Sequence, residues 1–296
     1  MTRQITLAAT QFACSADRAE NLEKAETMVR SAAAQGAQLI LIQELFETPY
    51  FCQEQRAELF GLATTVEDNP ALARFRILAR ELGVVLPVSF FERAGHAFLN
   101  SLAMVDGDGT MLGLYRKAHI PTGPGYQEKF YFTPGDTGFR VFETRVGRVG
   151  AAICWDQWFP ETARCLALGG AEILLFPTAI GSEPPPAPPV DSRLHWQRVM
   201  QGHAGANLMP LVASNRIGRE AMTASEITFY GSSFIAGPHG EIVVEAPCDC
   251  EAAIFASFDL DDVAEIRRGW GVFRDRRPDL YGMLLAHDGN EQREER

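Results

Sequence analysis

The stretch VGAAICWDQWFPE (149–161) is the most informative part of this chain for its fold, because it places a cysteine where a predicted buried strand ends. Its first part, 149–153, is an apolar run typical of a buried strand, and the residues after Cys154 read as the start of a helix. Strand ends in α/β sheets meet at a crevice, and N–H groups of a following helix can lower the pKa of a thiol or hold an oxyanion. Cys154 is therefore a candidate nucleophile, but most free cysteines are packing residues, and position alone leaves both readings open.

Strand and helix patterns alternate along the chain on both sides of this stretch. Strands are predicted over 5–12, 39–42, 84–92, 172–177, 209–215 and 252–260, with hairpins about 107–109 and between 232–237 and 241–245. Helices are predicted over 17–35, 70–82, 160–168 and 192–207. This interleaving predicts an α/β fold with two packed sheets and helices outside them. Since no linker divides the chain, we expect one domain over 1–285, with a C-terminal interface segment from about 260, and a charged tail over 286–296.

Composition excludes several classes of protein. The 38 acidic residues exceed the 27 basic ones, and this net charge of −11 argues against nucleic acid or an anionic membrane as a partner. No apolar run is long enough to span a membrane, and the opening apolar stretch is too short for a signal peptide. The 6 cysteines have no framework spacing, which favours a reducing, cytoplasmic setting. We expect no metal and no cofactor, because phosphate loops and clustered ligands are missing from the sequence.

Two further charged residues follow predicted strands. Glu44 comes after the strand 39–42 and is followed by apolar residues, so desolvation would favour its taking up a proton, as a general base does. Lys117, in YRKAHIP (115–121), follows the second strand of a hairpin. An ammonium there would favour a thiolate and stabilise an oxyanion. We expect Glu44 and Cys154 to lie on one edge of the sheet, with His119 as a packing or hydrogen-bonding residue.

These residues carry a resemblance to the nitrilase superfamily. The chain is similar to it in L-I-L-x-x-E, Y-R-K-x-H and I-C-x-[DE]-x-x-x-P-E, which occur here in the same order, and in GYQEKFYFTPGD (125–136). The resemblance implies a four-layer α-β-β-α sandwich that hydrolyses nonpeptide C–N bonds without a metal. It also implies a catalytic set of Glu44, Lys117 and Cys154, with Glu128 as a second carboxylate that orients them.

The chemistry expected of this set follows from the residue types. Glu44 would take the thiol proton, and the thiolate of Cys154 would attack a carbonyl or carbamoyl carbon. Lys117 and the backbone N–H of Trp155 would hold the oxyanion. Glu44 would then protonate the leaving amine and later activate the water that releases the thioester. Which C–N bond breaks first stays open, since either ammonia or the diamine can leave.

Longer stretches are similar to the N-carbamoylputrescine amidases within the superfamily. They are 119–139, 154–161, 176–184, 195–207, 212–218 and 270–281. Relatives that bind carbamoyl amino acids place cations after the nucleophile, whereas this chain has Gln157 and Trp158 there. An acidic residue is needed instead to hold a substrate ammonium group, and Glu183 is the first candidate and Asp191 the second. Asp156 is expected to support the turn at Cys154.

The remaining expectations concern substrate contacts and partners. The resemblance implies that Tyr126, Ala179 and Trp155 contact the substrate, a small cationic carbamoyl amine. The run EPPPAPP (183–189) would stiffen a loop beside the crevice. The Arg-rich stretch 266–279 reads as a docked segment at a contact in a homo-oligomer, a dimer or larger, and not as an RNA site. Two alternatives stay open: another amidase of the superfamily, acting on ω-amides or N-carbamoyl-β-alanine, and a catalytically silent scaffold.

Overall fold

Two β-sheets face each other in the computed structural model, which describes residues 2–185 and 191–290. The first sheet contains β14 (Ala252–Asp259), β1 (Gln4–Gln11) and β2 (Leu39–Leu41), and a parallel bridge from Leu39 to Val85 joins it to β3 (Leu86–Ala94), β4 (Ala97–Val105) and β5 (Met111–Arg116). The second has the order β13 (Ile242–Glu245), β12 (Phe234–Ala236), β9 (Leu211–Ser214), β8 (Ile173–Pro177), β7 (Gly147–Ala151) and β6 (Val141–Thr144).

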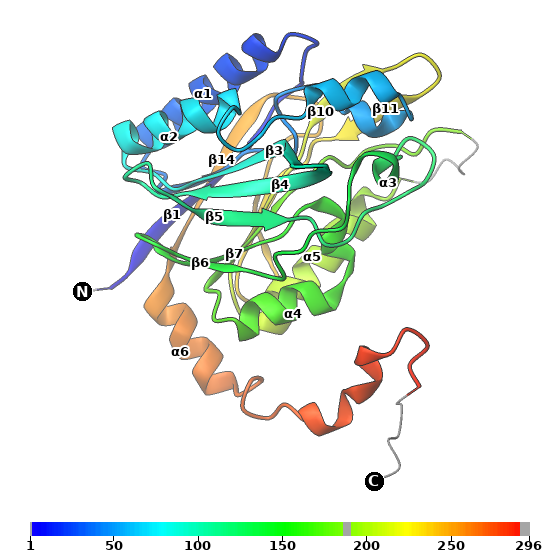
Figure 1. Ribbon diagram of the computed structural model, residues 1–296. Helices are drawn as coiled ribbons and strands as arrows, with labels where there is room; N and C mark the ends of the chain where they lie inside the picture. Colours follow the sequence, from blue (N-terminus) through cyan, green and yellow to red (C-terminus); the bar gives the residue numbers. More distant parts are fainter. Residues whose placement is uncertain (1, 186–190, 291–296) are drawn as a thin grey trace.

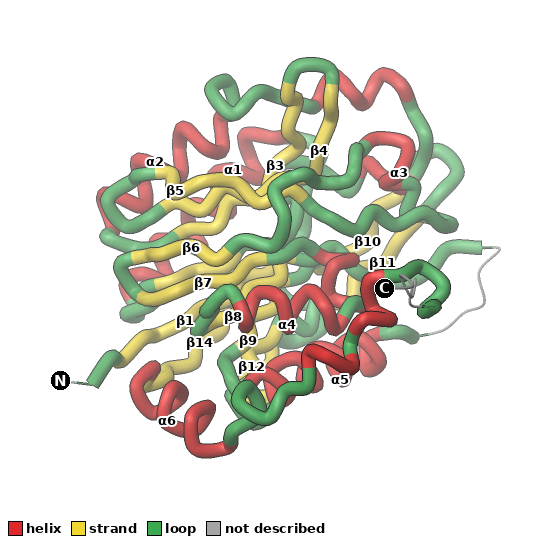
Figure 2. Tube along the Cα trace, turned by 60° about the horizontal axis from the view of Figure 1, so that its bottom comes forward, coloured by secondary structure: helices red, strands yellow, loops and turns green. Residues whose placement is uncertain are grey.

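Helices cover the outer faces of both sheets. The first sheet is covered by α1 (Arg18–Ala34) and α2 (Pro70–Leu82), and the second by α4 (Pro160–Leu168) and α5 (Arg193–Asn207) (Figures 1 and 2). The alternation of side chains along β1 explains these layers, because neighbouring residues of a strand point to opposite faces. Leu7 and Ala9 pack into the core between the sheets, whereas Ala8 packs under α1 and α2. The predicted α-β-β-α sandwich is confirmed.

Local signals in the sequence set the helix ends. Asp17 caps α1 by accepting a hydrogen bond from the backbone N–H of Ala19. Asn69 caps α2 in the same way through Leu72, Pro70 occupies the first turn, and Gly83 ends the helix with a left-handed φ of 68°. A proline at the first position and a glycine just past the end are the residues that these positions favour. The predicted bounds of α2 and α4 agree with the structure.

The region after Cys154 differs from the prediction. A short 3-10 helix, η3 (Cys154–Trp158), comes first, and α4 begins only at Pro160. Phe159 between them is extended, which suits a residue that precedes a proline. The helical pattern of WDQWFPE therefore covers two short elements rather than the start of one.

Several elements were not predicted. They are β6, the hairpin of β10 (Ile217–Ala221) and β11 (Glu226–Tyr230), α3 (Glu128–Tyr131), α6 (Leu260–Trp270) and four further 3-10 helices, at Phe51–Gln53, Ala57–Leu62, Pro278–Leu280 and Gly282–Leu285. The segment after α6 stands away from the body of the molecule (Figure 1). Of the segment expected to dock, Phe273 lies under Arg164 and Arg267, but Trp270 is 73% exposed. Within one chain, the segment is therefore only partly docked.

None of the helices that the structure describes is long and apolar enough to cross a membrane.

Candidate active site

Three of the four predicted catalytic residues come from the ends of strands in two sheets, and the fourth, Glu128, begins α3. Glu44 follows β2 and Lys117 follows β5 in the first sheet, and Cys154 follows β7 in the second. The expectation that Glu44 and Cys154 share one edge of a single sheet is therefore wrong. The two sheets pack face to face, so strand ends from both meet at one site. The backbone N–H of Glu44 lies 3.4 Å from the carbonyl of Thr178, which follows β8 of the second sheet.

A buried lysine lies between two buried carboxylates. The Nζ of Lys117 is 2.9 Å from Oε1 of Glu44 and 2.6 Å from Oε2 of Glu128. Asn100 donates a hydrogen bond of 2.7 Å to the same oxygen of Glu44, and the hydroxyl of Tyr50 donates one of 2.7 Å to Oε1 of Glu128. Among the described residues, Oε2 of Glu44 has no partner. Three of the four carboxylate oxygens of Glu44 and Glu128 thus have hydrogen-bonding partners, and Oε2 of Glu44 is free to accept a proton.

This cluster shifts the protonation of its members. Burial alone lowers the pKa of Lys117, but Glu128 and Glu44 outweigh it and raise that pKa well above its usual range, so the ammonium stays charged. Burial raises the pKa of Glu128 from 4.5 to about 7, although Lys117 opposes the shift. One lysine facing two carboxylates leaves the group with excess negative charge, which favours a proton on Glu128 near neutral pH.

Cys154 begins η3 in a strained backbone conformation. Its φ of 42° is left-handed, which costs a non-glycine residue about 1–3 kcal/mol and is common at functional sites. The thiol lies 3.9 Å from the carbonyl of Ala179. Trp155 is the second residue of η3, so its N–H has no acceptor within that helix and is available to an oxyanion.

The thiol is protonated at rest, contrary to the expectation that its surroundings lower its pKa. Burial, and next the negative charge of Glu44, raise the pKa of Cys154 well above its usual range, and Lys117 only partly offsets them. A thiol of this kind needs a base to become a nucleophile. The unpaired oxygen of nearby Glu44 is the group that suits this task.

Asp156 ties the Cys154 turn to the segment that carries Lys117. Its fully buried carboxylate accepts hydrogen bonds from the backbone N–H of Ile153 (3.0 Å), the hydroxyl of Tyr115 (2.7 Å) and the backbone N–H of His119 (2.9 Å). The His119 ring also contacts it at 2.8 Å and stacks on Phe159. The structural roles predicted for Asp156 and His119 are confirmed.

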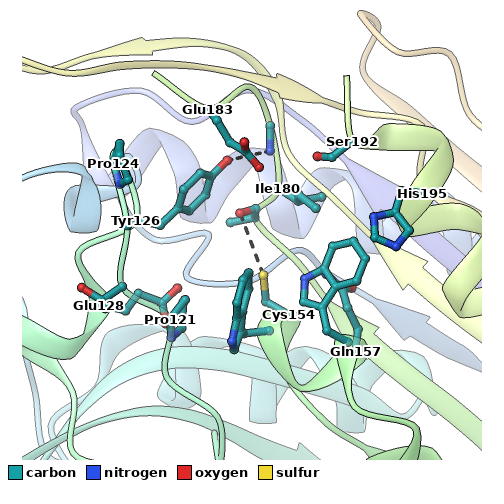
Figure 3. A pocket seen from close by; sticks show the side chains of 16 residues that line it. Pro121, Pro124, Tyr126, Glu128, Cys154, Gln157, Ile180, Glu183, Ser192 and His195 are labelled. Carbon is teal, nitrogen blue, oxygen red and sulfur yellow. Dashed lines mark hydrogen bonds between the residues drawn. The ribbon is translucent and has the colours of Figure 1, made fainter. Parts of the chain in front are cut away.

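A cavity of about 340 Å³ opens over the thiol (Figure 3). Its lining combines aromatic and apolar surface with a few polar groups: Pro121, Thr122, Gly123, Pro124, Tyr126, Glu128, Cys154, Trp155, Gln157, Trp158, Ala179, Ile180, Gly181, Glu183, Ser192 and His195. Within the described part of the chain, no lysine or arginine lines it. Glu183 lies across the cavity from Cys154, with its carboxylate directed inward (Figure 3).

Most of the predicted substrate contacts lie on this cavity. Trp155, Tyr126, Ala179 and Glu183 line it, together with the neutral pair after the nucleophile. The hydroxyl of Tyr126 accepts a hydrogen bond of 2.9 Å from the N–H of Gly181, which holds the loop that carries Glu183. Asp191 is not among the lining residues; its carboxylate accepts a hydrogen bond from the N–H of Arg193. Residues 186–190 of the proline-rich run lie outside the described residues.

Four residues of the site were not found from the sequence. Ser192 and His195 line the cavity, and the His195 ring lies 4.8 Å from that of Trp158, so His119 is not the only histidine near the site. Ser192 and His195 are three residues apart, so both lie on one face at the start of α5. This spacing is the sequence signal that could have identified them. Tyr50 and Asn100 fix the two carboxylates, but nothing in the sequence pairs them with these partners.

No group of three or more histidine, cysteine or acidic side chains in the described ranges is arranged to hold a metal ion.

Known proteins resemble this chain over nearly its whole length. A family model described as carbon-nitrogen hydrolase matches residues 6–268. An Arabidopsis thaliana protein named N-carbamoylputrescine amidase is 61% identical, with 97% of each chain covered. A Francisella tularensis protein named citrullinase is 51% identical, covering 95% of this chain and 98% of that protein. The crystal structure of a carbon-nitrogen hydrolase from Helicobacter pylori G27 is 40% identical, with a TM-score of 0.88 over 96% of this chain and 99% of that one.

Proposed function

Because the chain belongs to the carbon-nitrogen hydrolase family, we propose that it hydrolyses N-carbamoylputrescine to putrescine, carbon dioxide and ammonia through a thioester on Cys154. The observation that carries the proposal is the charge of the cavity. A carboxylate, Glu183, faces the thiol across it, and no described cation lines it. A substrate with an uncharged carbamoyl group and a cationic tail matches the two ends of the cavity, the first at Cys154 and the second at Glu183. Relatives named for this activity support the choice.

In the proposed first half-reaction, the free oxygen of Glu44 takes the proton of the Cys154 thiol as sulfur attacks the carbamoyl carbon. Lys117 and the N–H of Trp155 stabilise the oxyanion of the tetrahedral intermediate. Glu44 returns the proton to the leaving nitrogen, the C–N bond breaks, and the thioester remains. Glu128 and Tyr50 hold the ammonium of Lys117 in place during this transfer.

In the second half-reaction, Glu44 takes a proton from water, and the resulting hydroxide attacks the thioester carbon. The same oxyanion contacts stabilise the second tetrahedral intermediate. The carbon–sulfur bond then breaks, and the thiolate recovers its proton from Glu44. The carbamic acid released in this step decomposes to carbon dioxide and the remaining nitrogen product, ammonia or the amine. These steps require no cofactor, because the nucleophile, the base and the electrophilic groups are all parts of the chain.

At the other end of the cavity, the substrate ammonium is proposed to bind Glu183. Tyr126, Trp155 and Ala179 contact the tetramethylene chain, which suits the apolar lining. Both tryptophans that follow the nucleophile, Trp155 and Trp158, line the cavity, and the faces of aromatic rings attract cations. A free carboxylate on the substrate would meet Glu183, with no lysine or arginine among the described lining residues to compensate.

The test measures ammonia release from N-carbamoylputrescine, citrulline and N-carbamoyl-β-alanine by the wild type, Cys154→Ala, Glu183→Gln and the exposed control Glu143→Gln. We expect N-carbamoylputrescine to be preferred and Cys154→Ala to be inactive. Glu183→Gln should raise KM for N-carbamoylputrescine about tenfold or more, the effect of a lost charge-assisted contact. Equal turnover of either carboxylate substrate by the wild type would refute the assignment, and residual activity in Cys154→Ala would refute the mechanism.

We also propose that the chain is one domain over 1–285 and acts in the cytoplasm as a homo-oligomer. All cysteines in the described ranges are unpaired. Large apolar side chains are exposed along the segment from α6 onward: Trp270, Leu280, Tyr281, Met283, Leu284 and Leu285. Light scattering on the full chain and on Leu284→Glu, Leu285→Glu tests the contact. A wild-type monomer, or an assembly unchanged in the variant, would contradict it.

A further inference from the structure

Arg216 is a buried cation for which the proposed reaction has no role. It lies in VASNRIG (212–218), between β9 and β10, and its side chain is fully buried. The guanidinium lies 3.0 Å from Oε1 of Glu220, its one carboxylate partner among the residues that the structure describes. Burying a charge is costly, and replacing a buried ion pair by apolar residues is often neutral or stabilising. Stability alone is therefore a weak reason for a guanidinium at this position.

The other donors of Arg216 hold the main chain around the proposed base. Nη2 donates to the carbonyl of Glu44 at 3.0 Å and to that of Leu45 at 2.6 Å, and Nη1 donates to the carbonyl of Thr48 at 2.9 Å. The carbonyls of Glu44 and Leu45 belong to the peptide groups on the two sides of Leu45. The planar fork of a guanidinium fixes their directions, which a point charge cannot do.

The backbone at this place needs such support. Leu45 has a φ of 49°, a left-handed conformation that a branched residue adopts only when its surroundings impose it. The N–H of Leu45 is bound by the hydroxyl of Ser89 at 3.1 Å, and its carbonyl by Arg216. If this conformation relaxed, the direction of the Cα–Cβ bond of the preceding residue, Glu44, would change.

The second carboxylate is connected to the same guanidinium. Glu220 accepts a hydrogen bond from the N–H of Tyr50 with the oxygen that Arg216 does not use. The hydroxyl of Tyr50 in turn donates to Glu128, and Glu128 pairs with Lys117. The contacts therefore form a closed ring through both catalytic carboxylates, the lysine and Arg216.

We propose that Arg216, with Glu220, is a positioning residue that sets the directions of Glu44 and Glu128 for proton transfer. The inference rests on the proposed roles of these two carboxylates, and not on the identity of the substrate. Arg216 does not line the cavity, so its effect falls on the chemical step rather than on substrate binding. A displacement of about 1 Å in a catalytic group can cost about a hundredfold in rate.

The test compares an amide with an activated ester in Arg216→Lys. Both substrates need Glu44 to take the thiol proton, but breaking a C–N bond needs Glu44 a second time, to give a proton to the leaving nitrogen. The p-nitrophenolate of p-nitrophenyl acetate leaves without that second proton transfer. The amide is whichever carbamoyl amine or amide the wild type hydrolyses fastest, and the ester reaction is the burst of p-nitrophenolate. We expect kcat for the amide to fall about tenfold to a hundredfold relative to the ester burst, with KM changed less than about threefold.

Arg267→Lys is the matched control, because this guanidinium also donates to a main-chain carbonyl, that of Ala171, away from the cavity. Its amide-to-ester ratio should equal that of the wild type. A folded Arg216→Lys enzyme with an unchanged ratio, or with a raised KM and an unchanged kcat, would overturn the inference.

If Arg216→Lys does not fold, Glu220→Gln decides by the same ratio. The amide NH2 of the glutamine would face a donor, either the N–H of Tyr50 or Arg216, so the link from Arg216 through this side chain to Tyr50 is broken at one of its two contacts. A lowered ratio in Glu220→Gln supports the inference, and an unchanged ratio overturns it. A wild type that rejects N-carbamoylputrescine but hydrolyses another amide refutes the proposed substrate and leaves this comparison intact.

Discussion

Glu128→Gln is expected to change how stability depends on pH, by an amount that follows from the pKa of Glu128. Burial raises this pKa from 4.5 to about 7, so the folded protein binds the proton more readily than the unfolded chain. The stabilisation from this proton is complete below about pH 4.5 and is lost as pH rises through about 7. Each pH unit between the two pKa values contributes about 1.4 kcal/mol, so the wild type loses about 3 kcal/mol.

Glutamine has the shape of the protonated acid and cannot ionise, so the variant does not lose this stabilisation. Its free energy of unfolding, relative to the wild type, should rise by about 3 kcal/mol between pH 5 and pH 9. For a chain of this length, that corresponds to about 5 °C in relative Tm. Groups that titrate in both proteins cancel in the difference.

Thermal melts of wild type and variant across this pH range measure the effect, and Glu23→Gln, an exposed substitution on α1, is the control with a constant difference. A Tm difference for Glu128→Gln that is constant with pH, or that falls as pH rises, would refute the reasoning. It would mean that Lys117 outweighs burial and keeps Glu128 ionised throughout.

Three further substitutions test single contacts. Tyr50→Phe removes a hydrogen bond that favours the ionised form of Glu128, so it should raise the pKa of Glu128 further. Thermal melts of Tyr50→Phe with and without Glu128→Gln should therefore show their Tm difference rising at a higher pH than in the wild-type background. In Asp156→Asn, an amide NH2 would face a backbone N–H that now donates a hydrogen bond to the carboxylate. Chemical denaturation should show that the free energy of unfolding falls by about 2–4 kcal/mol. In Gly181→Ala, the new Cβ would lie 2.4 Å from the carbonyl of Thr228, so the loop of Glu183 must move, and steady-state assays should show KM raised several-fold.

The layers of the fold were predictable because most of its elements carry a strong local signal. The helix 70–82 has a proline at its start and a glycine after its end, and the strand 39–42 is continuously apolar. The elements that were missed lack such signals. Strand β10 (Ile217–Ala221) contains a glycine and two charged residues, and α6 reads first as an Arg-rich segment because its buried positions, Leu260 and Val263, are few.

The candidate site divides in the same way. Glu44, Lys117 and Cys154 were found because each charged or nucleophilic residue follows a strand, a pattern that one sequence displays directly. Asn100 and Arg216 were not, because a buried polar residue acquires its role from a partner elsewhere in the chain. Lys117 and Cys154 are 37 positions apart in sequence, and Arg216 lies 172 positions from Glu44, whose carbonyl it binds. Only the packing of the two sheets brings these groups together.

The arrangement of charges suits the proposed reaction to a buried site. At rest, the thiol of Cys154 is neutral, and the negative charge on Glu44 lies 2.9 Å from Lys117. In the proposed mechanism, the thiol proton passes to Glu44 as sulfur attacks, and the negative charge moves to the oxyanion, which the same lysine would stabilise. The net charge of the cluster does not change in this step. Because creating a new unpaired charge there would carry a large desolvation cost, a protonated thiol beside a paired carboxylate suits this enclosed site better than a preformed thiolate.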